Sequence, residues 1–161
     1  NDNLIGGAGN DTLLGGGHDD VLYGGSGDDV IQIRGERGLA MAGPGNDVIR
    51  ASDGKAEIDA GPGRNTIELG AGTHRVTLGP GPNRIVAGPG AKRFILERGA
   101  TVALTGWDKA QRYVLKDWPG PVQQRVLDGG EVMIFAATSC LVVTDCPPGL
   151  DLVSQVEGEG A

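Results

Sequence analysis

The sequence predicts an all-β solenoid, in which one short repeat winds into stacked strands. A nine-residue repeat starts at Gly6 and continues without an insertion to about residue 104, and position eight of nearly every unit is aliphatic. Stacked repeats of this kind bury one continuous apolar core. Thirty glycines in 161 residues would normally indicate disorder, but the regular spacing argues against it.

Three consecutive units, starting at Gly6, Gly15 and Gly24, share a stricter pattern. Glycine occupies positions one, two and four, Asp position six and an aliphatic residue position eight, except that His18 replaces one glycine. Glycines allow positive φ angles and so expose turn carbonyls. Carbonyl and carboxylate oxygens together are the ligands that Ca²⁺ prefers. The pattern therefore predicts calcium-binding turns.

This pattern resembles the calcium-binding nonapeptide of the RTX, or hemolysin-type, repeat proteins. The resemblance implies a right-handed parallel β-roll with two nonapeptides per turn. Residues eighteen apart would then stack at about 4.8 Å. It also implies calcium ions between consecutive turns, held by the aspartates of both.

Stacking in steps of eighteen places the position-six residues in one column along each edge of the roll. The first column reads Asp11, Asp29, Asp47, Asn65, Asn83 and Thr101, and the second reads Asp2, Asp20, Gly38, Ala56, His74 and Lys92. We expect the metal ligands among Asp11, Asp29, Asp47, Asp20, Asp2, Gly7, Gly9, Gly24, Gly25, Gly27, Gly43 and Gly45. For Asp2 with Asp20 a plain acidic surface is an equal alternative, because the first turn is cut. Asp19 and Asp28, at position five, are expected to face solvent.

The repeat changes character near residue 48. Position one becomes apolar, and position three becomes proline at Pro44, Pro62, Pro80 and Pro89. Residues 1–53 hold nine acids and three bases, whereas residues 54–126 hold six acids and eleven bases. Proline lowers the entropy of the unfolded chain. We therefore expect residues 1–50 to bind calcium and residues 51–104 to form a degenerate, metal-free continuation.

Residues 105–161 are expected to form a C-terminal β cap, since an open solenoid end exposes unpaired backbone. Strands are predicted at 131–136 and 140–144, joined as a hairpin, and at 150–156. Cys140 and Cys146 form a disulfide only if the chain reverses near residue 144, because an extended strand would separate them by about 20 Å. Both outcomes stay open.

Side chains outside these columns give weaker indications. His18 and His74 are expected to be exposed turn residues, and Asn65 and Asn83 to form an amide ladder. On the outer face, Glu57, Arg75 and Arg93 should lie side by side, because they are eighteen apart. No nucleophile and base are arranged as in a catalytic site, so the sequence does not predict an enzyme.

Composition excludes some functions. A pI near 4.7 argues against nucleic-acid binding, and no stretch reaches the roughly 20 apolar residues of a membrane helix. The chain begins inside a repeat, which predicts a piece of a longer protein. We expect an extracellular calcium-binding module of a secreted or surface protein, folded by calcium outside the cell. The alternatives are a self-associating module of a surface layer, adhesin or filament, and the RTX region of a secreted enzyme with an upstream catalytic domain.

Overall fold

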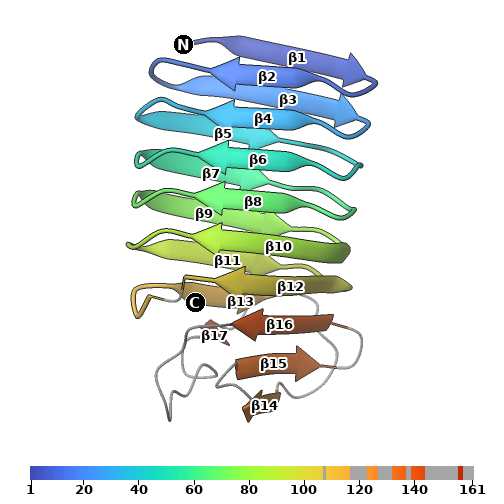
Figure 1. Ribbon diagram of the computed structural model, residues 1–161, viewed down its shortest axis with the longest axis vertical. Helices are drawn as coiled ribbons and strands as arrows, with labels where there is room; N and C mark the ends of the chain where they lie inside the picture. Colours follow the sequence, from blue (N-terminus) through green and yellow to red (C-terminus); the bar gives the residue numbers. More distant parts are fainter. Residues whose placement is uncertain (107, 117–122, 127–131, 137–138, 144–155, 158–161) are drawn as a thin grey trace.

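The fold consists of β-strands in two stacked sheets (Figure 1). The structure is a computed structural model, and it describes residues 1–106, 108–116, 123–126, 132–136, 139–143 and 156–157. Within these ranges there is no helix, and so none that could cross a membrane. The predicted all-β solenoid is confirmed.

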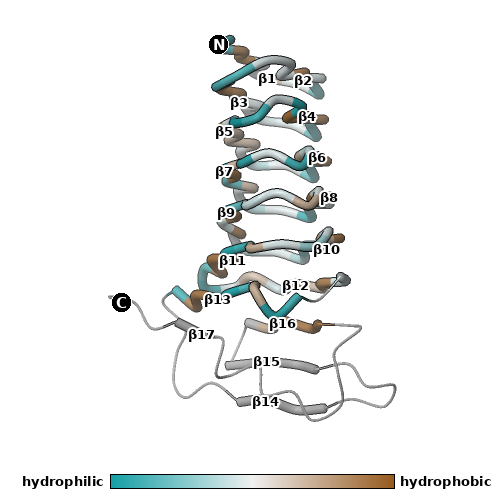
Figure 2. The backbone as a smooth tube through the Cα atoms, turned by 90° about the vertical axis from the view of Figure 1, so that its left-hand side faces the viewer, coloured by the Kyte–Doolittle hydropathy of each residue, from teal (hydrophilic) through white to brown (hydrophobic). Residues whose placement is uncertain are grey.

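The odd-numbered strands other than β15 form an eight-stranded sheet. The even-numbered strands together with β15 form a nine-stranded sheet. The eight-stranded sheet contains, in order, β1 (Asn3–Ala8), β3 (Asp20–Ser26), β5 (Arg37–Met41), β7 (Lys55–Asp59), β9 (Thr73–Leu78), β11 (Lys92–Leu96), β13 (Arg112–Leu115) and β17 (Val156–Glu157). The other sheet contains, in order, β14 (Gln123–Val126), β15 (Val132–Ala136), β16 (Ser139–Val143), β12 (Ala100–Thr105), β10 (Gly81–Ala87), β8 (Thr66–Leu69), β6 (Val48–Ala51), β4 (Val30–Ile33) and β2 (Thr12–Gly15). Figure 2 shows the two sheets as two columns joined by turns.

From β1 to β11 and from β2 to β10, neighbouring strands of each sheet pair in parallel with an offset of eighteen residues. Asn3 lies beside Val21, and the same step holds through β11 in one sheet and through β10 in the other. Each turn of the solenoid therefore contains two nonapeptides, as predicted.

The core lies between the sheets and is built from two inward positions per repeat. Position eight is buried in every unit to Phe94, at Leu13, Leu22, Ile31, Ala40, Ile49, Ile58, Ile67, Val76, Ile85 and Phe94. Position one adds a second buried layer in the lower turns, at Leu69, Leu78 and Leu96 among others. Two side chains per repeat thus enter the core where the sequence turns apolar at position one.

The eighteen-residue register ends at the turn Glu97–Gly99, which holds one extra residue. The N–H of Glu97 still bonds to the Leu78 carbonyl, but below it β12 and β13 are displaced by nineteen residues from β10 and β11. Ala103, which the unbroken count places at the inward position eight, and Thr101, predicted in the first column, are therefore exposed. Val102 and Leu104 point inward in their place.

After the extra residue at Glu97–Gly99, parallel pairing continues from β12 to β16 and from β13 to β17. The strands β14, β15 and β16 pair antiparallel. The predicted hairpin of residues 131–136 and 140–144 is thus present as β15 and β16. Residues 150–155 of the last predicted strand lie outside the described residues. Tyr113 stacks on Phe94 in the core with ring centroids 5.8 Å apart.

The outer face of the eight-stranded sheet carries the predicted charge ladder. Glu57 lies beside Arg75, and Arg75 beside Arg93. The Glu57 carboxylate is 3.7 Å from the Arg75 guanidinium, and both side chains are exposed. Glu97 pairs with Lys116 at 3.3 Å.

Two substitutions test the nineteen-residue step. Leu104→Ala should lower the free energy of unfolding by about 2–5 kcal/mol, because Leu104 is fully buried. Ala103→Asp should change it by no more than about 0.5 kcal/mol, since residue 103 is exposed and lies beside Arg84. Urea denaturation measures both. A large loss of unfolding free energy for Ala103→Asp, with a small loss for Leu104→Ala, would instead support an unbroken eighteen-residue register.

Candidate metal sites at the turn edges

The first turn edge is built on glycines that no other residue could replace without strain. Gly7, Gly25 and Gly43 have φ angles of 111°, 114° and 95°, a region that favours glycine. A Cβ atom on Gly25 would collide with the Gly7 carbonyl, and one on Gly43 with the Gly25 carbonyl. Glycine therefore lets these turns stack closely, with backbone oxygens at the edge.

The position-six aspartates of this edge form a continuous ladder. The N–H of Asp11 donates to Oδ1 of Asp29, and the N–H of Asp29 donates to Oδ1 of Asp47, both at 2.8 Å. Asp29 and Asp47 are each 1% exposed. One oxygen of each of these two carboxylates thus ties its turn to the turn above.

The second oxygen of each carboxylate has no such partner. Oδ2 of Asp11, Asp29 and Asp47 is buried and lacks a hydrogen bond. In Asp11 and Asp29 this oxygen lies at the glycine that opens the turn, since a Cβ on Gly6 would meet Oδ2 of Asp11 and one on Gly24 would meet Oδ2 of Asp29. A buried anionic oxygen without a donor is costly. These three oxygens suit a cation, and calcium fits this oxygen-rich edge.

Asn65, the next residue of the first column, donates side-chain hydrogen bonds that an aspartate cannot donate. Nδ2 of Asn65 donates to the carbonyls of Ala60 and Gly61, at 3.0 and 3.2 Å. It also donates to Oδ1 of Asn83 at 3.1 Å, which confirms the predicted amide ladder. An amide N–H₂ supplies donors where Asp supplies only another acceptor. The asparagine turns are thus closed by the protein's own hydrogen bonds.

On the second edge, the hydrogen bonding of the position-six aspartate differs from that on the first edge. Asp20 is 2% exposed, and its oxygens accept from the N–H of Asp2 at 2.9 Å and of Gly17 at 3.1 Å. These bonds, chiefly that from Asp2, hold the pKa of Asp20 below its ordinary value. Asp2 itself is exposed. The structure therefore gives Asp20 backbone donors in place of the unpaired oxygen found on the first edge.

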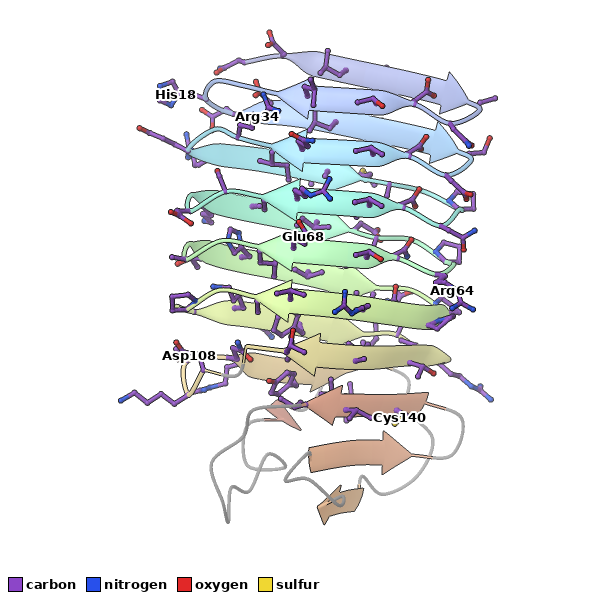
Figure 3. All side chains as sticks on the ribbon, in the orientation of Figure 1. His18, Arg34, Arg64, Glu68, Asp108 and Cys140 are labelled. Carbon is purple, nitrogen blue, oxygen red and sulfur yellow. The ribbon has the colours of Figure 1, made fainter. Side chains whose placement is uncertain are left out.

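A further ladder runs along position five, where the sequence indicated only solvent-facing residues. Asp28 is exposed as expected, but its Oδ1 accepts the N–H of Asn46 at 2.8 Å. Asn10 and Asn46 accept in the same way from the turns below them. Polar residues at position five recur every eighteen residues, and this recurrence in the sequence could have indicated the ladder. Figure 3 shows Arg64, the last of this row, at the edge opposite to His18 and Asp108.

His74 was predicted to be exposed, and this prediction is wrong. It is 2% exposed in the second column, and its Nδ1 accepts the N–H of Ala56 at 3.3 Å. Its Nε2 is buried without a hydrogen bond. Burial, and secondarily the charge of Lys92, lowers the pKa of His74, while the Gly70 carbonyl and Asp53 act in the opposite direction. His18 is exposed as predicted, 3.3 Å from Glu36.

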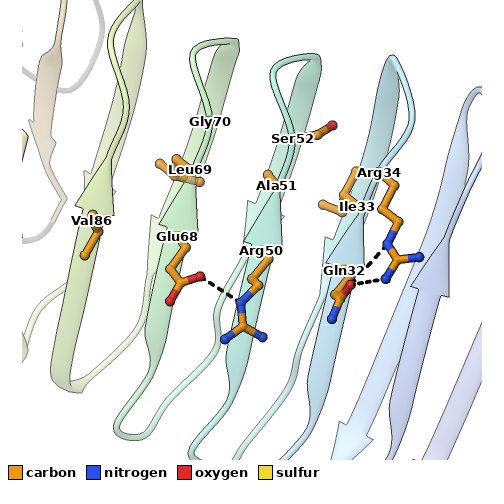
Figure 4. A pocket seen from close by; sticks show the side chains of 10 residues that line it. All are labelled: Gln32, Ile33, Arg34, Arg50, Ala51, Ser52, Glu68, Leu69, Gly70 and Val86. Atoms are coloured by element: carbon orange, nitrogen blue, oxygen red, sulfur yellow. Dashed lines mark hydrogen bonds and ion pairs between the residues drawn. The ribbon is translucent and has the colours of Figure 1, made fainter.

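Two other features carry no metal-binding arrangement. A shallow depression of about 440 Å³ on the nine-stranded sheet is lined by Arg50, Glu68 and Val86 among others (Figure 4), and its Arg50 and Glu68 pair with each other at 2.7 Å. Cys140 is half-buried, which raises its pKa, while Cys146 lies outside the described residues. In the described part of the chain, no group of three or more His, Cys, Asp or Glu side chains is placed to hold a metal ion.

The burial of His74 predicts a loss of stability in mild acid. Because its folded pKa is lowered, the unfolded state binds more protons as pH falls below about 6.5, and stability present above that pH is lost. His74→Asn, which keeps an acceptor for Ala56, should show a smaller drop in Tm between about pH 7.5 and about pH 5.5 than the wild type. His18→Asn serves as the exposed control and should behave as the wild type. An equal drop in the His74 variant would contradict this assignment.

Comparison with known proteins finds that these turns are similar to a known repeat. The sequence pattern of the RTX calcium-binding nonapeptide repeat matches residues 1–31 and 41–73, in four copies. The solved structure of the extracellular lipase LipA from Serratia marcescens is similar over 97% of this chain, with a TM-score of 0.50 and 14% identity. The chain spans 40% of that lipase chain, and this likeness concerns the fold alone. The comparison with curated proteins gave no match.

The family match includes all three aspartates with an unpaired oxygen, because Asp11 and Asp29 lie within residues 1–31 and Asp47 lies within residues 41–73. The repeat pattern, the parallel solenoid and the acceptor-rich turns agree with one another. The repeats at residues 1–31 and 41–73 match RTX nonapeptides, which bind Ca²⁺, and the chain folds as a parallel β-roll.

Proposed function

We propose that this chain is a calcium-binding module that folds outside the cell, with its ions on the first turn edge. The unpaired, buried Oδ2 atoms of Asp11, Asp29 and Asp47 carry this proposal. They face turns that supply backbone oxygens and no donor. Calcium bound there would supply the positive charge that these oxygens lack.

The ligands would come from consecutive turns of that edge. Asp11 with Asp29 would hold one ion and Asp29 with Asp47 a second, so that Asp29 serves both. Backbone oxygens would complete each site, from the turn glycines Gly7, Gly9, Gly24, Gly25, Gly27, Gly43 and Gly45. We do not extend the proposal to Asp2 and Asp20, because the oxygens of Asp20 already accept backbone donors.

Calcium would then control folding through charge. Without the ion, three acidic side chains stack in one column at the strand spacing of about 4.8 Å and repel one another. An ion that binds only the folded state stabilises it in proportion to the logarithm of its concentration. A low calcium concentration inside a cell and a high one outside would therefore couple folding to export.

The lower turns need no ion in this proposal. Asn65 and Asn83 bond directly to turn carbonyls, and their turns carry Pro62 and Pro80. The calcium-dependent part would thus lie in residues 1–50 and the independent part in residues 51–104.

The surrounding protein is proposed to be larger and extracellular. The family match and the fold shared with an extracellular lipase, of which this chain spans 40%, support this view. The roll itself would be a structural module, and any catalytic group would belong to another part of the same protein.

Replacing Asp29 tests the sites directly. Asp29→Asn should remove more bound calcium than Asp11→Asn, because Asp29 contributes to two sites and Asp11 to one. Isothermal titration calorimetry with calcium measures the number of sites. The asparagine variant should still fold, since an amide at position six can donate to turn carbonyls, as in Asn65.

Asp28→Asn is the matched control, because Asp28 is exposed and adjacent in sequence. It should bind as much calcium as the wild type. Equal losses for Asp11→Asn and Asp29→Asn, or no calcium binding by the wild type, would contradict the assignment of ligands to this column.

A further inference from the structure

Lys92 is a buried lysine at position six of the second edge. It is 2% exposed, and its side chain turns into the edge of the roll. Its ammonium donates to the carbonyls of Pro89 at 2.6 Å, Gly72 at 3.0 Å and Gly90 at 3.5 Å. An ammonium has three N–H donors and no acceptor, which matches three carbonyl oxygens.

These carbonyls come from two successive turns. Gly72 precedes β9, whereas Pro89 and Gly90 precede β11, the next strand of the same sheet. Lys92 therefore connects two levels of the roll through one positive group.

Two carboxylates surround this group without bonding to it in the described contacts. Oδ2 of Asp108 accepts the N–H of Gly90 at 3.0 Å, and Oδ1 of Asp53 accepts the N–H of Ala71 at 2.8 Å. Burial lowers the pKa of Lys92, and the charges of Asp108 and Asp53 oppose that shift. The site thus offers carbonyl oxygens close to the cation and negative charge farther out.

We infer that the second edge contains a built cation site between two turns, and that the Lys92 ammonium is its permanently attached occupant. The corresponding residues of the neighbouring turns carry no such charge. The neutral amide of Gln111 donates to the Gly106 carbonyl at 2.8 Å, and the imidazole of His74 accepts the N–H of Ala56. Among these, Lys92 alone brings a full charge to carbonyls of two turns. This inference does not depend on calcium binding at the first edge.

The chemical class of ligand follows from the oxygens. Without the lysine side chain, the site would retain three carbonyl oxygens and two nearby carboxylates, and would accept a small cation such as ammonium, methylammonium or K⁺. Tetramethylammonium carries the same charge but has no N–H donor and cannot approach the carbonyls closely.

Chemical rescue of Lys92→Ala tests this site. We would record thermal unfolding of the full chain in calcium-free buffer at one ionic strength, with tetramethylammonium chloride or with ammonium, methylammonium or potassium chloride. In tetramethylammonium, the variant should lose about 4–10 °C in Tm relative to the wild type. Ammonium or methylammonium should recover at least about half of that shift.

Two other variants make the result specific. Lys55→Ala removes an exposed lysine from the same sheet, and it should show neither the loss nor the rescue. Lys92→Gln should fold and show no difference between the salts, because a neutral amide donor fills the site as Gln111 does. A Lys92→Ala chain as stable as the wild type, equally destabilised in every salt, or unfolded in every salt would overturn the inference.

Discussion

Stacked turns concentrate hydrogen-bond acceptors, and the rest of this structure depends on how each turn neutralises them. Parallel pairing satisfies the strands, and at the first edge turn amides such as those of Gly25 and Gly27 also donate to carbonyls of the next level. At the first edge, Asp29 and Asp47 add a second acceptor that has no donor. Each level therefore needs either a cation or a side-chain donor.

The two halves of the roll meet this need by different means. In the upper turns the position-six residue is acidic, and calcium is the proposed counter-charge. In the lower turns the donors belong to the chain itself, as the amide of Asn65 and the ammonium of Lys92 show. The core changes in parallel, because apolar residues such as Leu69 and Leu78 join the inward position-eight residues where the acidic column ends. Burial and internal donors thus increase together along the chain.

Much of the fold could be predicted because one residue type marks each structural role. Glycine marks the turns, position eight marks the core, and steps of eighteen residues give the neighbours across each sheet. The extra residue at the turn Glu97–Gly99 could not be recognised from glycine spacing, because Gly99 falls where the unbroken count also expects a glycine. The larger aliphatic residues Val102 and Leu104, on either side of Ala103, were the better indication of which side chains point inward.

The site was predictable in part. The column of Asp11, Asp29 and Asp47 follows from spacing alone, but the different hydrogen bonding of Asp20 depends on the conformation of its turn, which spacing does not show. The burial of His74 and Lys92 was missed because both are polar residues in a sequence position that elsewhere meets water or metal. Backbone groups supply their partners at this position: carbonyl oxygens accept from Lys92, and the N–H of Ala56 donates to His74.

Hydrogen exchange of the full chain, with calcium and after its removal, tests the division of the roll most directly. With calcium, amides throughout residues 6–100 should be protected. After removal, residues 6–50 should exchange faster while residues 60–100 keep their protection, because internal donors hold the lower turns. Uniform loss of protection along the roll, or no change at all, would contradict the account.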